Sequence, residues 1–182
     1  MKMSSVFTLL FAPSFLIFLH YFEFKVVLSV YIILSILLLI YTYIKHKFSK
    51  NLLIPTIYFS LLLISYFFAS FTIIKFIPVI ISIMFLTLFI DATINKRELI
   101  LKFTQKFYPK KLAKEEIAFL KNGDKYWVWV ISISTIFQFS LIFYDDVFWA
   151  FYSSAGWYIF FFISLIIQIL YGRFYAVRLY SK

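Results

Sequence analysis

The amino-acid sequence predicts an all-α, polytopic membrane protein with six transmembrane helices and an amphipathic helical loop. Its 182 residues are 64% hydrophobic and only 14% charged, and the mean hydropathy of +0.94 lies outside the range of soluble domains. Long apolar blocks alternate with connections that are in turn basic and nearly neutral. Because a bilayer core about 30 Å thick needs roughly 20 apolar residues per helix, residues 1–182 have room for about six spans in a single membrane domain.

The first two predicted spans cover residues 6–22 and 26–44. Lys2 and the apolar block after it are typical of a signal peptide, but no small-residue cleavage site closes the block, which favours a retained span. Pro13 lies inside this span and removes a backbone hydrogen bond, so we expect the helix to bend there.

The third predicted span covers residues 52–71. It follows a basic connection that marks a cytoplasmic loop and contains Lys45, His46, Lys47 and Lys50. Asn51 can cap the helix, and Pro55 is tolerated in the first turn, where a backbone N–H has no intrahelical partner.

The fourth predicted span covers residues 76–94, with Pro78 near its start. Its apolar core, Phe76–Ile90, is shorter than the hydrocarbon layer, so Lys75 and Asp91 are expected at the two interfaces. We expect Lys75 to snorkel outward, with its ammonium group in the polar layer.

Residues 95–125 form the one long polar stretch, and their pattern predicts a pair of helices on the membrane surface. Ile100, Phe103 and Phe107 recur at helical spacing, while basic residues fill much of the remaining surface. Pro109 is expected to break this helix. A second short helix is predicted from about residue 112 to 120, with Asn122 and Gly123 as a stop.

The last two predicted spans cover residues 126–144 and 151–171, with Tyr and Trp near their ends as in an aromatic belt. Gln138 and Gln168 are their deepest polar residues, and we expect these amides to hydrogen-bond between helices. The chain has only three glycines and no GxxxG motif, which predicts helix contacts made by large side chains.

Charge placement predicts the orientation of the chain. With six spans, 16 of the 18 Lys and Arg fall on one side of the membrane, and only Lys25 and Lys75 fall on the other. The positive-inside rule then places both termini in the cytoplasm. The same distribution explains the net charge of +10 without nucleic acid, because the cations lie beside apolar spans.

The residues available for chemistry are few. The chain has no Cys, two His and eight carboxylates, with no paired-His metal motif and no nucleotide fingerprint. We therefore expect no catalytic residues, no metal and no cofactor, and a protein that is not an enzyme.

Four charged residues are candidates for substrate contacts: Lys75, Asp91, Asp145 and Asp146. The adjacent Asp145 and Asp146 would form a cation site if Lys75 and His20 approached them, and would otherwise be solvated loop residues. Asp91 is the carboxylate nearest the membrane interior, where ionisable residues are often functional. The alternative is an ordinary pairing with the neighbouring Asn95 or Lys96.

The surface loop supplies candidate contacts with anionic lipid head groups or with a partner protein. These are Lys96, Arg97, Lys102, Lys106, Lys110 and Lys111. A second interpretation stays open, in which these cations only set the topology.

Several features between residues 75 and 180 carry a resemblance to a known family. They are Lys75-Phe-Ile-Pro78-Val, the basic helix Glu98–Lys106, Tyr108-Pro109 with Leu112 and Glu115-Glu116, Tyr126-Trp127-Val128-Trp129, and Tyr171-Gly172-Arg173. In this order they resemble the small inner-membrane proteins of the septation protein A type and their relatives encoded with fatty-acid or aryl polyene biosynthesis genes.

This resemblance implies a location in the bacterial inner membrane and a role in septation, envelope maintenance or acyl-chain assembly, with division or acyl-biosynthesis proteins as partners. We therefore favour a non-enzymatic scaffold or accessory. A small transporter or flippase is the alternative, and it would need a polar cavity lined by residues such as Gln138 and Gln168. A membrane transferase would need a convergent acid–base pair, which the sequence does not place together.

Overall fold

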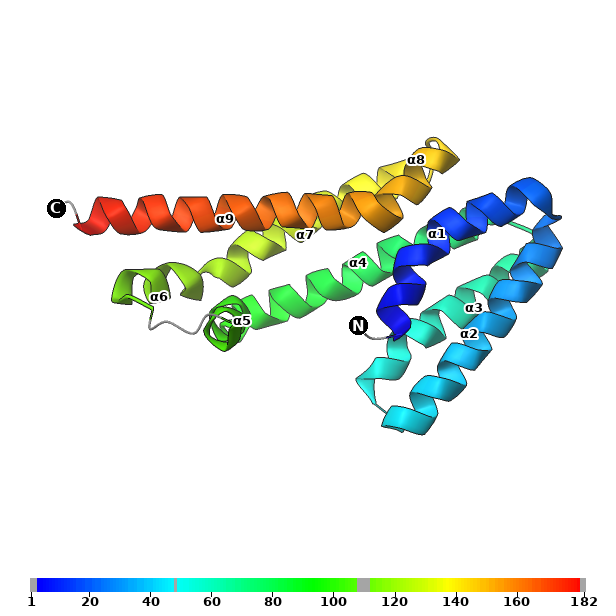
Figure 1. The fold of residues 1–182 in the computed structure, drawn as a ribbon, viewed down its shortest axis with the longest axis horizontal. Helices are drawn as coiled ribbons and strands as arrows, with labels where there is room; N and C mark the ends of the chain where they lie inside the picture. The colour runs from blue at the N-terminus through cyan, green and yellow to red at the C-terminus, as the bar shows by residue number, and fades with distance from the viewer. Residues whose placement is uncertain (1–2, 48, 108–111, 181–182) are drawn as a thin grey trace. The chain divides into compact units, whose positions relative to one another are not determined.

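The computed structural model describes residues 3–47, 49–107 and 112–180, and every regular element within them is helical (Figure 1). The elements are α1 (Met3–Tyr21), α2 (Phe24–His46), the 3-10 turn η1 (Lys50–Leu52), α3 (Leu53–Phe68), α4 (Phe71–Ile94), α5 (Leu99–Phe107), α6 (Lys114–Lys121), α7 (Gly123–Leu141), α8 (Asp146–Phe151), the π-helical turn η2 (Tyr152–Gly156) and α9 (Trp157–Tyr180). The predicted all-α class is confirmed.

Within the described ranges, three segments are long and apolar enough to cross a membrane: Phe24–His46, Phe71–Ile94 and Asp146–Phe174. Two further apolar stretches, Leu10–Tyr21 and Leu53–Phe68, are shorter. These lengths and compositions support a membrane protein, and the predicted count of six spans stays a prediction.

The chain divides into two compact units. Unit 1 comprises residues 1–81 and 137–157, and unit 2 comprises residues 82–136 and 158–182.

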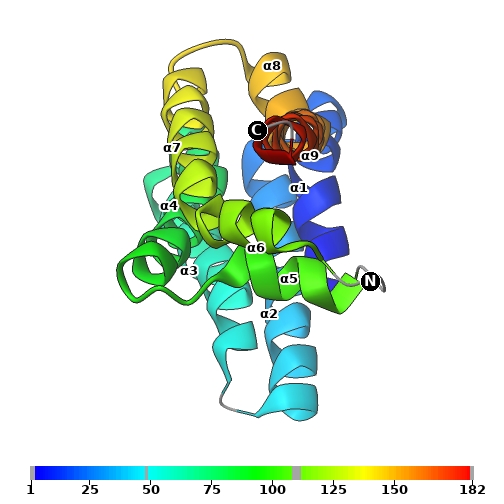
Figure 2. The same cartoon turned by 90° about the vertical axis from the view of Figure 1, so that its left-hand side faces the viewer.

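Unit 1 is built around aromatic side chains of α1. Phe11 and Phe15 are almost fully buried. The Phe11 ring centroid lies 4.9 Å from that of Tyr58 in α3 and 5.3 Å from that of Tyr31 in α2, both edge to face. Aromatic rings prefer this arrangement, so α1 joins the two helices of the α2–α3 pair, which lie side by side (Figures 1 and 2).

The first helix bends as the sequence predicts. Pro13 lies inside α1, and Figure 1 shows the helix changing direction part way along its length. The neighbouring Ser14 shares a hydrogen bond of 2.6 Å with the Tyr31 hydroxyl, which fastens the bend to α2.

The fourth helix begins five residues before the predicted position. Ala69 ends α3 in the left-handed conformation, with φ of 49°, and the Ser70 N–H donates to the Ser65 carbonyl at 3.2 Å. This is the Schellman pattern, which reverses the chain within two residues. As a result α4 starts at Phe71, and Lys75 lies a full turn inside the helix.

The last spans also differ from their predicted bounds. Gly123 begins α7 and does not act as a stop in the left-handed conformation. The helical region of the sixth predicted span begins at Asp146, because the Asp145 carboxylate accepts a hydrogen bond from the Phe148 N–H at 2.8 Å and caps α8.

Unit 2 contains hydrogen bonds that join α7 to both of its long neighbours. Ser82 of α4 and Thr135 of α7 share a hydrogen bond of 2.7 Å. Toward the other end of α7, the Tyr126 hydroxyl donates to the Ser164 carbonyl of α9 at 2.8 Å. Polar side chains thus hold these three apolar helices together within the unit.

Ala69 provides a test of backbone strain. Replacing Ala69 with Gly removes the Cβ that a left-handed residue disfavours, so we expect Ala69→Gly to raise the free energy of unfolding by about 1 kcal/mol. Ala118 is exposed in the right-handed helix α6, and there the same change, Ala118→Gly, should lower it by about 1 kcal/mol. Unfolding in detergent micelles measures both, and equal signs for the two variants would contradict the prediction.

Candidate functional site

The basic helical pair, α5 and α6, is the candidate site, and a carboxylate of α7 fixes its position. Asp124 is only 3% exposed. Its Oδ2 accepts from the Leu99 N–H at 2.9 Å and its Oδ1 from the Ile100 N–H at 3.0 Å. The first N–H groups of a helix have no intrahelical acceptor and favour negative charge, so Asp124 caps α5 from a different helix.

Two glycines let the pair approach the longer helices closely. A Cβ on Gly123 would lie 2.8 Å from Cγ2 of Ile100 in α5, and one on Gly172 of α9 would lie 2.8 Å from Cε1 of Phe119 in α6. Both distances are too short for carbon atoms. The expectation that helix contacts use only large side chains is therefore wrong at α5 and α6, where a large side chain meets bare backbone.

The turn between α4 and α5 is tight. Lys96 and Glu98 have φ of 50° and 51°, and the Arg97 N–H donates to the Ala92 carbonyl at 2.8 Å. Glu98 then pairs with Lys121 of α6 at 3.6 Å, which links the two members of the basic pair.

Asp91 makes local interactions. Its Oδ1 accepts from the Asn95 amide at 2.6 Å, and its Oδ2 lies 3.0 Å from the Arg97 guanidinium. The predicted pairing with Asn95 is confirmed. Lys96 was the other predicted alternative, and the charged partner in the structure is Arg97.

The candidate lipid-binding cations fall into three groups. Lys96, Lys102 and Lys106 are exposed. Arg97 is also exposed, and its guanidinium pairs with Asp91. The remaining two, Lys110 and Lys111, lie outside the described residues.

The apolar face of α5 differs from the predicted stripe. Leu101 is the buried residue, at 4% exposure, whereas Phe103 is 61% exposed. Ile100 packs against Gly123, in agreement with its place in the predicted apolar stripe. The side chain of Phe107 lies outside the described part of the chain. In this position, with its start held by Asp124, α5 turns Leu101 and Ile100 toward the protein, while Phe103 is largely exposed.

The orientation of α5 suits a surface helix. Figure 1 shows α5 nearly end-on and α9 lengthwise, and Figure 2 shows the reverse. Within unit 2, α5 therefore runs across the direction of α9.

Lys75 and Asp146 form an ion pair in unit 1. The Lys75 side chain is only 7% exposed, and its Nζ also donates to the Ile142 carbonyl at 3.1 Å. The Trp149 indole donates in turn to the Lys75 carbonyl at 3.3 Å. A carboxylate and a carbonyl of the α7–α8 connection thus hold the Lys75 ammonium within the protein, and the prediction that Lys75 snorkels outward from the membrane stays a prediction.

The structure thus brings together two of the four proposed substrate contacts. Asp146 pairs with Lys75, whereas Asp145 caps α8 and Asp91 holds Arg97. His20 is exposed and its ring meets that of Tyr21 edge to face, with centroids 5.1 Å apart. Among the residues that the structure describes, no group of three or more His, Asp or Glu could hold a metal ion.

The two buried glutamines differ in their surroundings. Gln168 Oε1 accepts from the Trp127 indole of α7 at 2.8 Å, which confirms the predicted interhelical hydrogen bond. Gln138 Oε1 is buried and accepts no hydrogen bond from the described residues.

Sequence reasoning missed Asp124, which is the residue that positions the basic pair. An Asp directly after Asn122-Gly123 is a signal for a helix start, and Asp124 does lie in the first turn of α7. Nothing local in the sequence indicates that its oxygens serve a different helix.

Comparisons with protein-family models, curated proteins and solved structures gave no match.

Asp124→Asn tests the cap. An amide offers one acceptor where the carboxylate offers two, and its NH₂ group would face a backbone donor, so we expect a loss of about 2 kcal/mol in stability. Amide hydrogen exchange at Leu99 and Ile100 should accelerate. The matched control is Asp145→Asn, at an exposed cap that Asn also fills well, with an expected cost of a few tenths of a kcal/mol. Equal losses in the two variants would argue against a special role for Asp124.

Asp146→Ala tests the ion pair. The change leaves a buried ammonium without its counter-ion, and we expect it to lower the free energy of unfolding by about 2 kcal/mol. Adding Lys75→Met removes that charge while keeping a similar side-chain volume, so the double variant should be more stable than Asp146→Ala alone. Unfolding in micelles measures both, and a less stable double variant would contradict this account.

Proposed function

We propose that this chain is a non-enzymatic protein of a bacterial inner membrane, in which the basic helical pair binds anionic head groups and holds a scaffold or accessory site at the membrane surface. The observation that carries the proposal is the fixed position of α5. Asp124 caps the helix at 2.9 and 3.0 Å while Lys96, Lys102 and Lys106 stay exposed. A surface helix held in this way presents its cations in a defined place.

Charge and apolar exposure on α5 support a membrane surface as the binding surface. An interfacial helix lies in the plane of the membrane with apolar side chains toward the acyl chains and cations toward the head groups. Phe103 and Lys102 are both exposed on α5. Near an anionic surface each Lys or Arg contributes about 1 kcal/mol of attraction.

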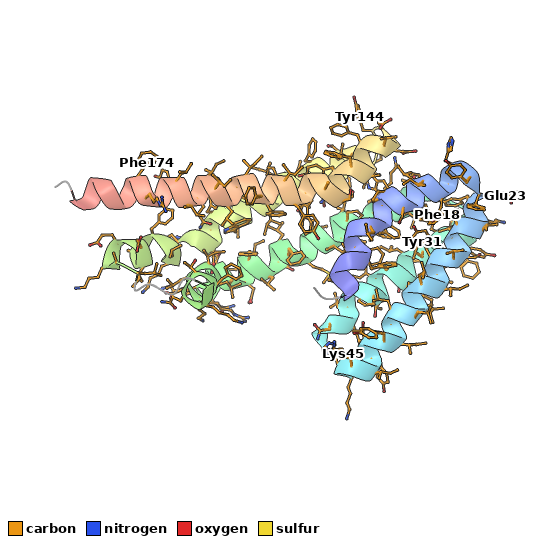
Figure 3. All side chains as sticks on the ribbon, viewed as in Figure 1. Phe18, Glu23, Tyr31, Lys45, Tyr144 and Phe174 are labelled. Atoms are coloured by element: carbon orange, nitrogen blue, oxygen red, sulfur yellow. The ribbon has the colours of Figure 1, made fainter. Side chains whose placement is uncertain are left out.

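The proposed topology has six spans and two cytoplasmic termini. The three long apolar segments supply three of these spans, and the regions of α1, α3 and α7 supply the other three. Local thinning of the bilayer would accommodate the short helix α3. In unit 1, Glu23 and Lys45 lie at opposite ends of α2 (Figure 3). The Lys45 end continues into the basic connection, which the positive-inside rule assigns to the cytoplasm.

The resemblance to septation protein A-type proteins suggests the biological setting. We propose envelope maintenance, septation or acyl-chain and lipid-linked biosynthesis, with a division or biosynthesis protein as partner. The residues that carry this resemblance include Glu115-Glu116, and Glu116 accepts from the Ala113 N–H at 2.9 Å, so it helps to form α6.

The alternative of a small transporter or flippase would draw on Lys75, Asp91, Asp145 and Asp146 for a charged or lipid-like substrate. Each of these side chains has a protein partner. Gln138 lines a small cavity, in which the centre of a water-sized sphere can move within about 10 Å³. This volume holds a single water molecule and is too small for a larger solute. We therefore favour the scaffold.

A photo-crosslinking experiment tests the proposed lipid contact. A photoreactive residue at the exposed Gln105 leaves every α5 lysine in place, and in native membranes we expect it to capture anionic lipid, together with an envelope protein if a partner is bound. Lys102→Glu with Lys106→Glu should reduce the captured anionic lipid severalfold, because two attractions become repulsions.

The matched control replaces Lys45 and Lys47 with Glu, which changes the net charge by the same amount in another basic connection. Capture from Gln105 should then stay at its original level, provided that topology mapping shows normal insertion. The proposal fails if the α5 reversals leave both lipid capture and the envelope phenotype unchanged in a correctly inserted protein.

A further inference from the structure

The π-helical turn η2 borders a small cavity in unit 1. Side chains from α1, α3, α4, α7, η2 and α9 line it: Thr8, Phe11, Ala12, Tyr58, Pro78, Ile81, Gln138, Ser153 and Trp157. A sphere the size of a water molecule fits in this cavity, and its centre can move within a volume of about 10 Å³. A single buried water needs about this volume, together with two to four polar partners.

Two polar atoms that line this cavity lack a partner among the described residues. Gln138 Oε1 belongs to α7 and Ser153 Oγ to η2, and the two residues are 3% and 8% exposed. Leaving a buried donor or acceptor without a hydrogen bond costs about 1–3 kcal/mol for each group. The same cavity can relieve both costs if a small molecule that donates and accepts hydrogen bonds occupies it.

The neighbouring Ser154 shows why the π turn matters. Its hydroxyl donates to the Ala150 carbonyl at 2.8 Å, the usual way for a helical serine to satisfy itself. Ser153 instead lines the cavity. A π turn contains one more residue than an α-turn, which changes the directions of successive side chains and is frequent at functional sites.

We propose that this cavity is a binding site for one water molecule. The water donates a hydrogen bond to Gln138 Oε1 and accepts one from the Ser153 hydroxyl, so it joins α7 to the turn between α8 and α9. Phe11, Ala12 and Ile81 form the apolar part of the lining and limit the occupant to the size of water. This assignment is independent of the lipid-binding role of α5.

Radiolytic footprinting of the full-length protein in nanodiscs tests the site. Hydroxyl radicals formed from a bound water oxidise the side chains beside it. Tyr58 lines the cavity and Trp149 does not, although both are 1% exposed. We expect Tyr58 to be oxidised severalfold faster than Trp149, even though indole is the more reactive ring. Oxidation of Tyr58 at or below the rate of Trp149 would overturn the proposal.

Three variants connect this signal to the two polar atoms. Gln138→Leu keeps a similar volume and Ser153→Ala removes the hydroxyl, so each should lower Tyr58 oxidation severalfold. Ser154→Ala is the matched control in the same turn and should leave it unchanged. If Gln138→Leu and Ser153→Ala fold and keep the wild-type rate, the assignment is wrong. If either fails to fold, the wild-type comparison of Tyr58 with Trp149 still decides it.

Discussion

The structure depends on one constraint, which is that polar groups inside an apolar helical protein need hydrogen-bond partners away from bulk water. With 64% hydrophobic residues, the chain has few polar side chains for this role. Four of the buried ones, Lys75, Ser82, Asp124 and Gln168, join two elements. Ser14 meets Tyr31, Ser82 meets Thr135, and Trp127 meets Gln168. Hydrophobic burial distinguishes poorly between helix neighbours in lipid, so these polar pairs specify which helices meet.

Asp124 and Lys75 are the two strongest cases of this constraint, one in each unit. Each is a buried charged residue whose partners include backbone groups near a helix end: two N–H groups at the start of α5, and the Ile142 carbonyl just after α7. Helix ends carry partial charges and unsatisfied groups, so a buried charge can be stabilised there. Asp124 holds the start of α5 in place, and Lys75 holds the α7–α8 connection in place. Both are therefore positioning residues.

The sequence was informative where the signal is local. Hydropathy located the apolar blocks, Pro13 located a bend, and the spacing of Ile100 with the surrounding lysines located the short helix α5. It failed where the deciding contact is distant in the chain. The face that α5 buries depends on Asp124 and Gly123. Periodicity defines an apolar stripe, but a cap from another helix decided that Leu101 faces inward and Phe103 outward.

The glycines and the left-handed residues of this chain give it two distinct kinds of mutational sensitivity. None of the three glycines has a positive φ, while Lys47, Ala69, Lys96 and Glu98 do. At Gly123 and Gly172 the limit is a neighbouring side chain, Ile100 or Phe119. A second substitution that shortens that neighbour can therefore suppress a harmful change. The left-handed positions have no such remedy, because their strain belongs to the backbone and no neighbour can be trimmed to relieve it. Genetic suppressors should thus gather around Gly123 and Gly172 and be absent from the neighbours of the four left-handed residues.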